Sequence, residues 1–235
     1  MISFIVPAYN EQDLLGATLA ALHSAARGAG FTYQIIVADD GSTDRTASIA
    51  REHGAQVVTV AVRQIAAARN AGARAATGES LIFVDADTIV SAELLRAAVD
   101  ALRSGVVGGG TVVRIDGRIP LYLRPATTIF PWMLYALRLA AGCFIFCTRD
   151  AFNAVGGFDE TLYATEEIAL SRALKRHGRF VILRLPVLTS GRKLRSHSAA
   201  EIFGLFGAAI RGRRSLLRTR RHLGIWYGTR REDPK

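Results

Sequence analysis

Three short runs of polar residues hold the side chains of this sequence that could do chemistry: 7–11, 39–44 and 85–87. In the last run an alanine separates two aspartates, so both carboxylates can face one cleft. Carboxylate oxygens, with water and phosphate oxygens completing the shell, are the ligands that magnesium and manganese prefer. Asp39 and Asp40 are adjacent, so their mutual repulsion must be offset by hydrogen-bond donors or by a cation. The rest of that run, Ser42 to Asp44, is also typical of a turn that caps a helix.

Each run follows an apolar segment, and the apolar segments alternate with helical patterns. The periodicity predicts strands over 2–6, 34–38, 56–60 and 81–84, and helices over 13–27, 44–53, 65–76 and 92–103. Further strands are expected at 142–147 and 180–185, with 104–125 as a loop. This alternation predicts an α/β fold with a parallel sheet. In such sheets ligands bind beyond the carboxyl ends of the strands, where the three polar runs lie.

Five motifs occur in a fixed order along the chain. They are IVPAYNE (5–11), VADDGSTD (37–44), AARNAGARAATGESLIFVDADT (67–88), GGFDE (156–160) and TEEIALSRALKRHG (165–178). With these motifs, most of residues 1–185 resembles the family 2 glycosyltransferases. The resemblance implies the GT-A fold, a Rossmann-like, mostly parallel sheet flanked by helices. It also implies inverting, metal-assisted transfer of a sugar from a nucleotide-diphosphate sugar to a carbohydrate or lipid-linked acceptor.

The resemblance assigns the donor nucleotide to the first half of the chain. Tyr9 would stack on or border the base, and Asp40 would accept a hydrogen bond from it, with Asp39 nearby. Arg69 matches an arginine that contacts the nucleotide. The complete expected set of nucleotide-binding residues is Pro7, Tyr9, Glu11, Asp39, Asp40, Arg69, Asp85, Ala86 and Asp87.

The same resemblance implies a Mn²⁺ or Mg²⁺ ion at the third polar run. Asp87 would contact the metal that bridges the two phosphates, and Asp85 would hold the ribose or a metal-bound water. His197 is a less favoured additional ligand, because a lone histidine in a polar segment is usually just solvated. The two cysteines, Cys143 and Cys147, are expected to pack in the core on one face of a strand.

The catalytic base is expected at Glu166 and Glu167, where many members of the family have an aspartate. Inverting transfer needs a carboxylate that takes the proton of the acceptor hydroxyl, an effect worth roughly 10²–10⁴-fold in rate. Glu167 is the favoured base, and the choice between the two stays open here. The alternative interpretation is structural, since acidic residues stabilise the N-terminus of the helix expected at 166–177.

Two further groups complete the expected site. In GGFDE, the expected acceptor-binding residues are Gly157, Phe158 and Asp159. Gly157 allows a tight loop, Phe158 anchors it, and Asp159 is a candidate contact of the acceptor. Arg192 and Lys193 resemble a basic motif that closes over the diphosphate.

The charge is divided unevenly along the 235 residues. Residues 1–117 hold 9 Lys and Arg against 12 Asp and Glu, whereas residues 118–235 hold 21 against 8. Arginine matches phosphate geometry, so nucleic acid, an anionic membrane and a phosphorylated ligand are all candidate partners. The tail at 198–235 combines arginines with Trp226 and Tyr227, and predicts a basic amphipathic helix with peripheral membrane contact.

These observations predict a GT-A domain over 1–197, with a nucleotide-sugar half at 1–104 and an acceptor half at 105–197, and a basic extension at 198–235. No uncharged stretch reaches the length of a spanning helix, and the start of the chain lacks a secretory signal pattern. We expect a cytoplasmic protein, with peripheral contact at the inner face of the membrane. One alternative is a nucleic-acid-binding protein, but the sequence shows no nucleic-acid-binding motif and we expect no nucleic-acid partner. The other alternative is a catalytically silent scaffold.

Overall fold

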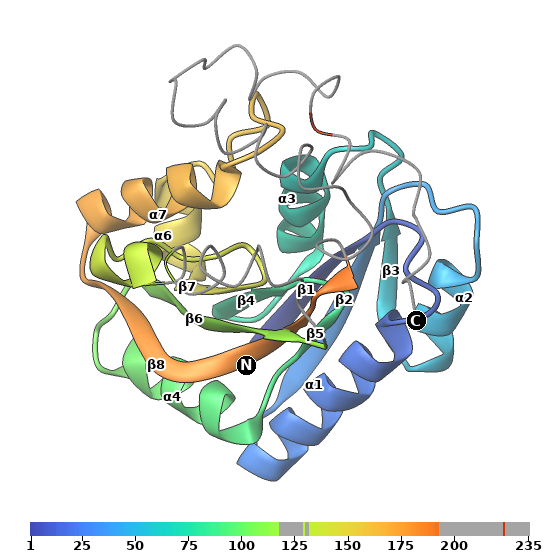
Figure 1. The fold of residues 1–235 in the computed structure, drawn as a ribbon, viewed down its shortest axis with the longest axis horizontal. Helices are drawn as coiled ribbons and strands as arrows, with labels where there is room; N and C mark the ends of the chain where they lie inside the picture. The colour runs from blue at the N-terminus through green and yellow to red at the C-terminus, as the bar shows by residue number, and fades with distance from the viewer. Residues whose placement is uncertain (118–128, 130–131, 193–222, 224–235) are drawn as a thin grey trace.

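The computed structural model describes residues 1–117, 129, 132–192 and 223, and has an α/β fold built on one curled, eight-stranded sheet (Figure 1). The strand order is β3-β2-β1-β4-β7-β6-β8-β5. The strands are β1 (Ile2–Ala8), β2 (Tyr33–Asp39), β3 (Gln56–Thr59), β4 (Ser80–Val84), β5 (Thr88–Ile89), β6 (Gly108–Asp116), β7 (Phe144–Thr148) and β8 (Phe180–Ser190). The helices are α1 (Leu15–Ala29), α2 (Thr46–Glu52), α3 (Ile65–Ala75), α4 (Ala92–Arg103), α6 (Arg149–Ala154) and α7 (Glu166–His177).

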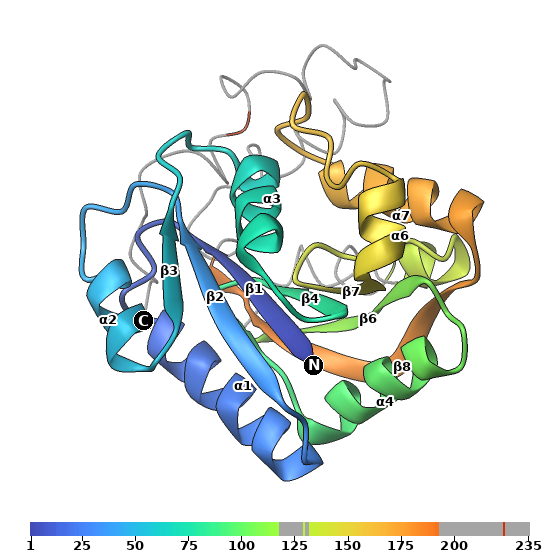
Figure 2. The ribbon, with the colours of Figure 1, turned by 180° about the vertical axis from the view of Figure 1, so that it is seen from behind.

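The four strands expected in the first half form a parallel block. β1 pairs in parallel with β2 and β4, and β2 with β3 (Figure 2). β1 and β4 are apolar along most of their length and are buried on both faces, as expected of strands with helices on either side. The prediction of a mostly parallel sheet flanked by helices is confirmed for these elements.

Two hydrophobic layers cover the sheet, one on each face. α1 and α4 pack on one face through residues such as Leu19 and Leu94. α3, α6 and α7 pack on the other through residues such as Phe152 and Leu174. In Figure 1, α1 and α4 accordingly lie below the sheet and α3 and α7 above it.

The expected loop at 104–125 was wrong in part, because it contains β6, which lies between β7 and β8. β6 begins with three glycines, which have no strand propensity, so the sequence pattern did not reveal it. A Cβ on Gly109 would collide with the Phe146 ring and the Val181 carbonyl. The glycines therefore let neighbouring strands approach closely, an effect that no local pattern encodes.

β8 is longer than the expected 180–185 and reaches Ser190. It runs parallel to β6, with an irregularity between Thr111 and Val113, and its last residues pair with β5. This extension carries Thr189 to the residues that follow β4.

The expectation of one shared face for the two cysteines was wrong, although both are buried. Cys143 packs in the layer of α1 and α4, and Cys147 in the layer of α3 and α7. The reason is that β7 begins only at Phe144, so Cys143 stands outside the alternation of the strand.

Lys193, His197 and nearly all of the tail at 198–235 lie outside the described residues, so the roles expected for them stay predictions. The domain division at 104 and 197 also stays a prediction. Within the part of the chain that the structure describes, no helix is long and apolar enough to cross a membrane.

Candidate functional site

The polar runs meet at one edge of the sheet. β1, β2 and β4 are parallel, so the residues that follow their carboxyl ends lie next to one another. The beginning of α7 and the end of β8 reach the same edge through contacts of Arg69 and Thr189. The site therefore combines five segments that are far apart in the sequence.

Asp40 holds the loop that leads into α3. Its Oδ1 accepts hydrogen bonds from the backbone N–H groups of Val62 (2.8 Å) and Arg63 (2.6 Å), and its Oδ2 accepts one from Gln64 (2.6 Å). Asp39 accepts a bond from the Ser42 N–H. These backbone donors offset the repulsion of this buried pair.

The loop held by Asp40 brings a residue to the site that the motifs did not indicate. The guanidinium carbon of Arg63 lies 3.2 Å from the centroid of the Tyr9 ring, a close cation–π contact. Arg63 has a backbone φ of 54°, in the left-handed region. Tyr9 was expected at the base, so a base that stacks on it must share the ring with Arg63 or displace it.

Arg69 is the centre of a buried ion network. Its side chain is 3% exposed and donates to Asp85 Oδ1 (2.9 Å), Glu166 Oε1 (2.8 Å) and the Gly142 carbonyl (3.0 Å). Burial lowers the pKa of Arg69, but the charges of Asp85 and Glu166 outweigh that effect, so its pKa is raised. Arg69 therefore stays protonated and links the end of β4 to the start of α7.

Asp87 is buried and is oriented by a chain of hydroxyl groups. Thr88 Oγ1 donates to Thr189 Oγ1 (3.0 Å), which donates to Asp87 Oδ1 (3.3 Å). Ala86 is buried between the two aspartates, and its carbonyl accepts from Thr18 Oγ1. Sequence reasoning missed Thr189 as a partner of Asp87, because 102 residues separate the two side chains in the chain.

The donor set fits a hard divalent cation that takes few ligands from protein. Asp85 and Asp87 supply carboxylate oxygens, which suit Mn²⁺ or Mg²⁺ when water and phosphate oxygens fill the other positions. Among the described residues, no group of three or more His, Cys, Asp and Glu could hold a metal alone. A Mn²⁺ or Mg²⁺ ion held by Asp85 and Asp87 would need water or phosphate oxygens as its other ligands.

The two candidate bases differ in their environment. Glu166 is 5% exposed and pairs with Arg69, whereas Glu167 is partly buried beside this pair. Burial, followed by the charge of Glu166, raises the pKa of Glu167 from 4.5 to about 8. Thr165, just before them, has a φ of 66°, a strained conformation for a β-branched residue that places the start of α7.

The GGFDE loop is fastened to α3. Asn70 donates to the Phe158 carbonyl (2.9 Å) and accepts from the Phe158 N–H (2.9 Å). Gly157 has a φ of 75°, and Phe158 is buried, as expected of a tight, anchored loop. Asp159 is exposed and accepts bonds from Thr161, so its expected contact with the acceptor stays a prediction.

Arg192 and Glu11 form a buried ion pair between the end of β8 and the end of β1. The resemblance placed Glu11 among the nucleotide-binding residues and Arg192 at the diphosphate. In this structure the two side chains contact each other. Pro7, in β1, pairs with Ala38 of β2 and so positions the strand end next to Asp39.

Comparison with known proteins identifies the family. The model of glycosyl transferase family 2 matches residues 3–156, more than half of the chain. The chain belongs to glycosyl transferase family 2. Its fold is the GT-A fold: a mannosyltransferase from Pyrobaculum calidifontis, solved with GDP-Man and Mn²⁺, superposes with a TM-score of 0.68 at 21% identity, covering 89% of this chain and 64% of that one.

Two sequence relatives extend the comparison. An uncharacterized glycosyltransferase of Mycobacterium tuberculosis is 33% identical over 135 residues, which cover 57% of this family 2 chain and 59% of that protein. The undecaprenyl-phosphate 4-deoxy-4-formamido-L-arabinose transferase of Edwardsiella ictaluri is 34% identical over 123 residues, 47% of this chain and 36% of that protein. The chain thus spans less than two thirds of the length of these relatives.

Proposed function

We propose that this protein transfers a sugar, with inversion, from a nucleoside-diphosphate sugar, and that Glu167 is the general base. The observation that carries the proposal is the difference between the two glutamates in their contacts and pKa. Arg69 binds Glu166, which leaves Glu167 as the carboxylate of raised pKa near Asp85. A base with a pKa near the working pH holds the acceptor proton more strongly than an ordinary carboxylate does.

The reaction needs one proton transfer and one displacement. The acceptor hydroxyl attacks the anomeric carbon from the face opposite the diphosphate, while the Glu167 carboxylate takes its proton. The bond from the anomeric carbon to the diphosphate oxygen breaks, and the nucleoside diphosphate leaves with the electron pair. Inversion follows because attack and departure occur on opposite faces of the sugar.

The donor half supplies binding and charge. Asp87 and Asp85 would hold a Mn²⁺ or Mg²⁺ ion, and when bound this ion offsets the negative charge that develops on the leaving diphosphate. Tyr9 with Arg63 would contact the base, and Asp40 keeps the loop that carries Arg63 in place. The Mn²⁺ and GDP-Man in the Pyrobaculum structure support a donor of this class.

The acceptor is proposed to be a carbohydrate or a lipid-linked group. Support comes from the relative named as an undecaprenyl-phosphate transferase, whose name places its reaction on a lipid phosphate. The competing function, nucleic-acid binding, has only the net charge of +10 in its favour. The second alternative, a silent scaffold, does not require the partnered Asp85, Asp87 and Glu166 that the site retains.

The decisive experiment compares two isosteric variants. Glu167→Gln should keep affinity for a nucleoside diphosphate with Mn²⁺, measured by calorimetry, and lose transfer by roughly 10²–10⁴-fold. Glu166→Gln should keep more transfer than Glu167→Gln, because the base remains. The reverse order of activities would show that Glu166 is the base.

Two further measurements test the donor and the stereochemistry. Asp87→Ala should abolish the Mn²⁺-dependent part of diphosphate binding, and unchanged affinity would remove the metal assignment. The anomeric configuration of the product, read by NMR, should be opposite to that of the donor. Retention of configuration would contradict a single displacement with a glutamate base.

A further inference from the structure

The segment 132–139, which begins with a short helix over 132–136, has a buried side and an exposed side of unusual composition. Leu134 and Leu139 are 6% exposed and anchor the segment in the protein. Trp132, Met133 and Leu137 are instead 69%, 40% and 52% exposed. A large aromatic and two long aliphatic side chains in water carry a cost that a partner surface would remove.

Two polar contacts hold this segment against α7 and β8. The Arg184 Nε of β8 donates to the Tyr135 hydroxyl (3.1 Å), and the Lys175 Nζ of α7 donates to the Leu137 carbonyl (3.0 Å). Leu185 follows Arg184 and is 39% exposed, and Ile129 precedes the segment and is 62% exposed. We call Ile129, Trp132, Met133, Leu137 and Leu185 the apolar patch.

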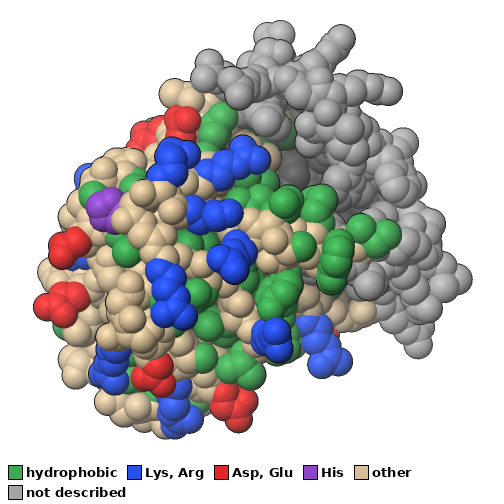
Figure 3. Space-filling view, turned by 90° about the vertical axis from the view of Figure 1, so that its left-hand side faces the viewer, with side chains coloured by type: hydrophobic (Ala, Val, Ile, Leu, Met, Phe, Trp, Pro, Cys, Tyr) green, Lys and Arg blue, Asp and Glu red, His purple; other side chains and the backbone are tan. Residues whose placement is uncertain are grey.

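Basic side chains accompany the apolar patch, and the sequence segments that form it contain no acidic ones. The exposed cations of the segment, of α7, of β8 and of the turn between the last two are Arg138, Arg172, Lys175, Arg176, Arg179 and Arg184. The sequence has no Asp or Glu at all between 117 and 149 or between 168 and 192. Figure 3, which looks at the side of the molecule where α7 and β8 lie, shows Lys and Arg side chains beside a stretch of hydrophobic ones.

We propose that this face binds the surface of an anionic lipid bilayer. A Trp with aliphatic neighbours enters the boundary between headgroups and acyl chains, while surrounding Arg and Lys contact anionic headgroups. The long stems of these cations cover apolar surface as their charges reach the phosphates. A nucleic acid would use the charges but not the apolar patch, so a lipid surface satisfies both.

The segment also connects this face to the site. Beyond Leu137 the chain passes Ala140, whose N–H donates to Ser171 Oγ of α7 (3.0 Å). It then reaches Gly142, whose carbonyl accepts from Arg69 (3.0 Å). The short stretch from Leu137 to Gly142 therefore joins this face to the Arg69 network. The proposal goes beyond sugar transfer and does not depend on which acceptor is used.

The test uses the full chain and flotation with vesicles of phosphatidylcholine, with and without phosphatidylglycerol. The wild type should float with the anionic vesicles and lose binding at high salt. Trp132→Ser/Leu137→Ser should weaken this binding by about tenfold or more through lost apolar insertion. Arg172→Gln/Arg176→Gln should weaken it by about tenfold through lost charge.

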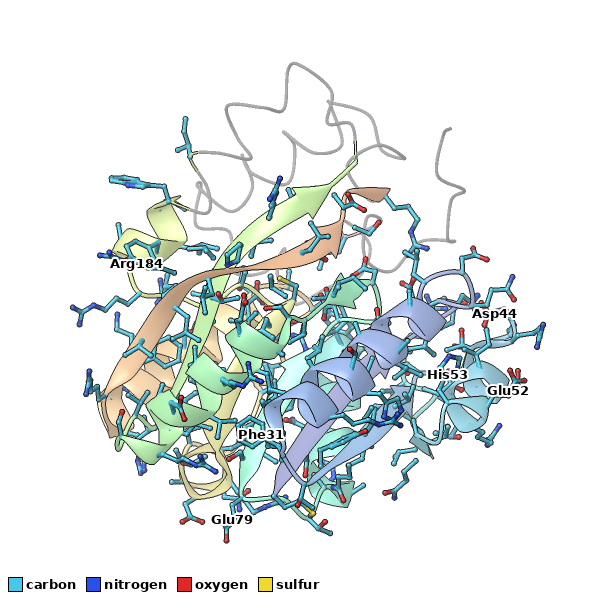
Figure 4. All side chains as sticks on the ribbon, turned by 90° about the horizontal axis from the view of Figure 1, so that it is seen from below. Phe31, Asp44, Glu52, His53, Glu79 and Arg184 are labelled. Carbon is cyan, nitrogen blue, oxygen red and sulfur yellow. The ribbon has the colours of Figure 1, made fainter. Side chains whose placement is uncertain are left out.

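The matched control is Arg27→Gln/Arg51→Gln on α1 and α2, which removes the same charge elsewhere. Figure 4 shows Arg184 at one end of the molecule and Asp44 and Glu52, beside α2, at the other. The control should bind vesicles like the wild type. The chain has two tryptophans, Trp132 and Trp226. In a Trp226→Phe variant only Trp132 is left, so binding to anionic vesicles should shift the tryptophan emission to the blue.

Several outcomes would overturn the proposal. They are a wild type that does not float, equal binding to neutral and anionic vesicles, and patch variants that bind as well as the wild type. The last result would assign binding to the arginine-rich tail. Nucleoside-diphosphate binding with Mn²⁺, measured on the same variants, should be unchanged, so failure here stays separate from failure of the proposed transferase function.

Discussion

Charged side chains have opposite environments in two regions of the molecule. The first region is the edge of the sheet at β1, β2 and β4, and the second is the outer face of α7 and β8. At the sheet edge each buried carboxylate has a partner nearby: backbone N–H groups for Asp40, Arg69 for Asp85 and Glu166, and Thr189 for Asp87. On the outer face the cations are exposed and have no acidic neighbours in sequence. Burial makes an unpaired charge expensive, whereas water tolerates one. The paired edge is thus suited to position a small ligand, and the exposed, cationic face to attract a large anionic one.

The largest effect should come from breaking the ion network of the sheet edge. Arg69→Ala leaves Asp85 and Glu166 without their cation, and we expect a loss of about 3–5 kcal/mol in the free energy of unfolding. Arg74→Ala, also on α3, removes an exposed pair with Glu160 at 3.9 Å and should cost less than about 1 kcal/mol. Urea denaturation of both variants measures the contrast, and equal losses would contradict it.

A smaller loss should follow when the backbone donors of the same edge are released. Asp40→Ala leaves three N–H groups of the loop at 62–64 without their acceptor, and we expect a cost of about 1–3 kcal/mol because water reaches the loop in part. Hydrogen exchange at Val62 to Gln64 should accelerate more than exchange in α4. Unchanged protection of the loop would mean that other contacts hold it.

The second half of the sheet offers a test that involves packing alone. Gly109→Ala places a Cβ against the Phe146 ring and the Val181 carbonyl, so we expect a loss of about 1–3 kcal/mol from overpacking. Gly28→Ala, in α1, meets only the Ala92 Cβ at 3.8 Å and should instead stabilise by about 0.4–1 kcal/mol. Thermal unfolding should therefore shift in opposite directions for the two variants.

A pH-dependent effect should appear where the two regions meet, at the start of α7. The folded-state pKa of Glu167 is raised to about 8, so the folded state holds its proton more tightly than the unfolded state. Stability should therefore fall as pH rises from 4.5 to 8. The Glu167→Gln variant has no titrating group at this position. The melting temperature of the variant minus that of the wild type should therefore increase as the pH rises from 4.5 to 8. A difference that stays constant from pH 5 to pH 8.5 would contradict the raised pKa.

The first half of the fold was predictable because each element there has a local signal. Apolar runs followed by Asp39-Asp40 and by Asp85-Ala86-Asp87 predicted β2 and β4, and parallel pairing then placed the polar runs together. β6 was not predictable, since Gly108 to Gly110 have little strand propensity and instead let the neighbouring strands approach closely. Arg63 and Thr189 were missed for a related reason: their roles depend on partners 54 and 102 residues away.

The sequence by itself determined the family, the α/β class and the residue types at the site, because motifs and periodicity are local properties. Only the tertiary structure decided how those residues are divided among tasks. Arg69 selects Glu166 over Glu167 by geometry, and Glu11 meets Arg192 from the other end of the described chain. It also decided that Trp132 and Leu137 are exposed while Leu134 is buried. Burial and pairing are set by distant segments, so their energies are absent from any local pattern.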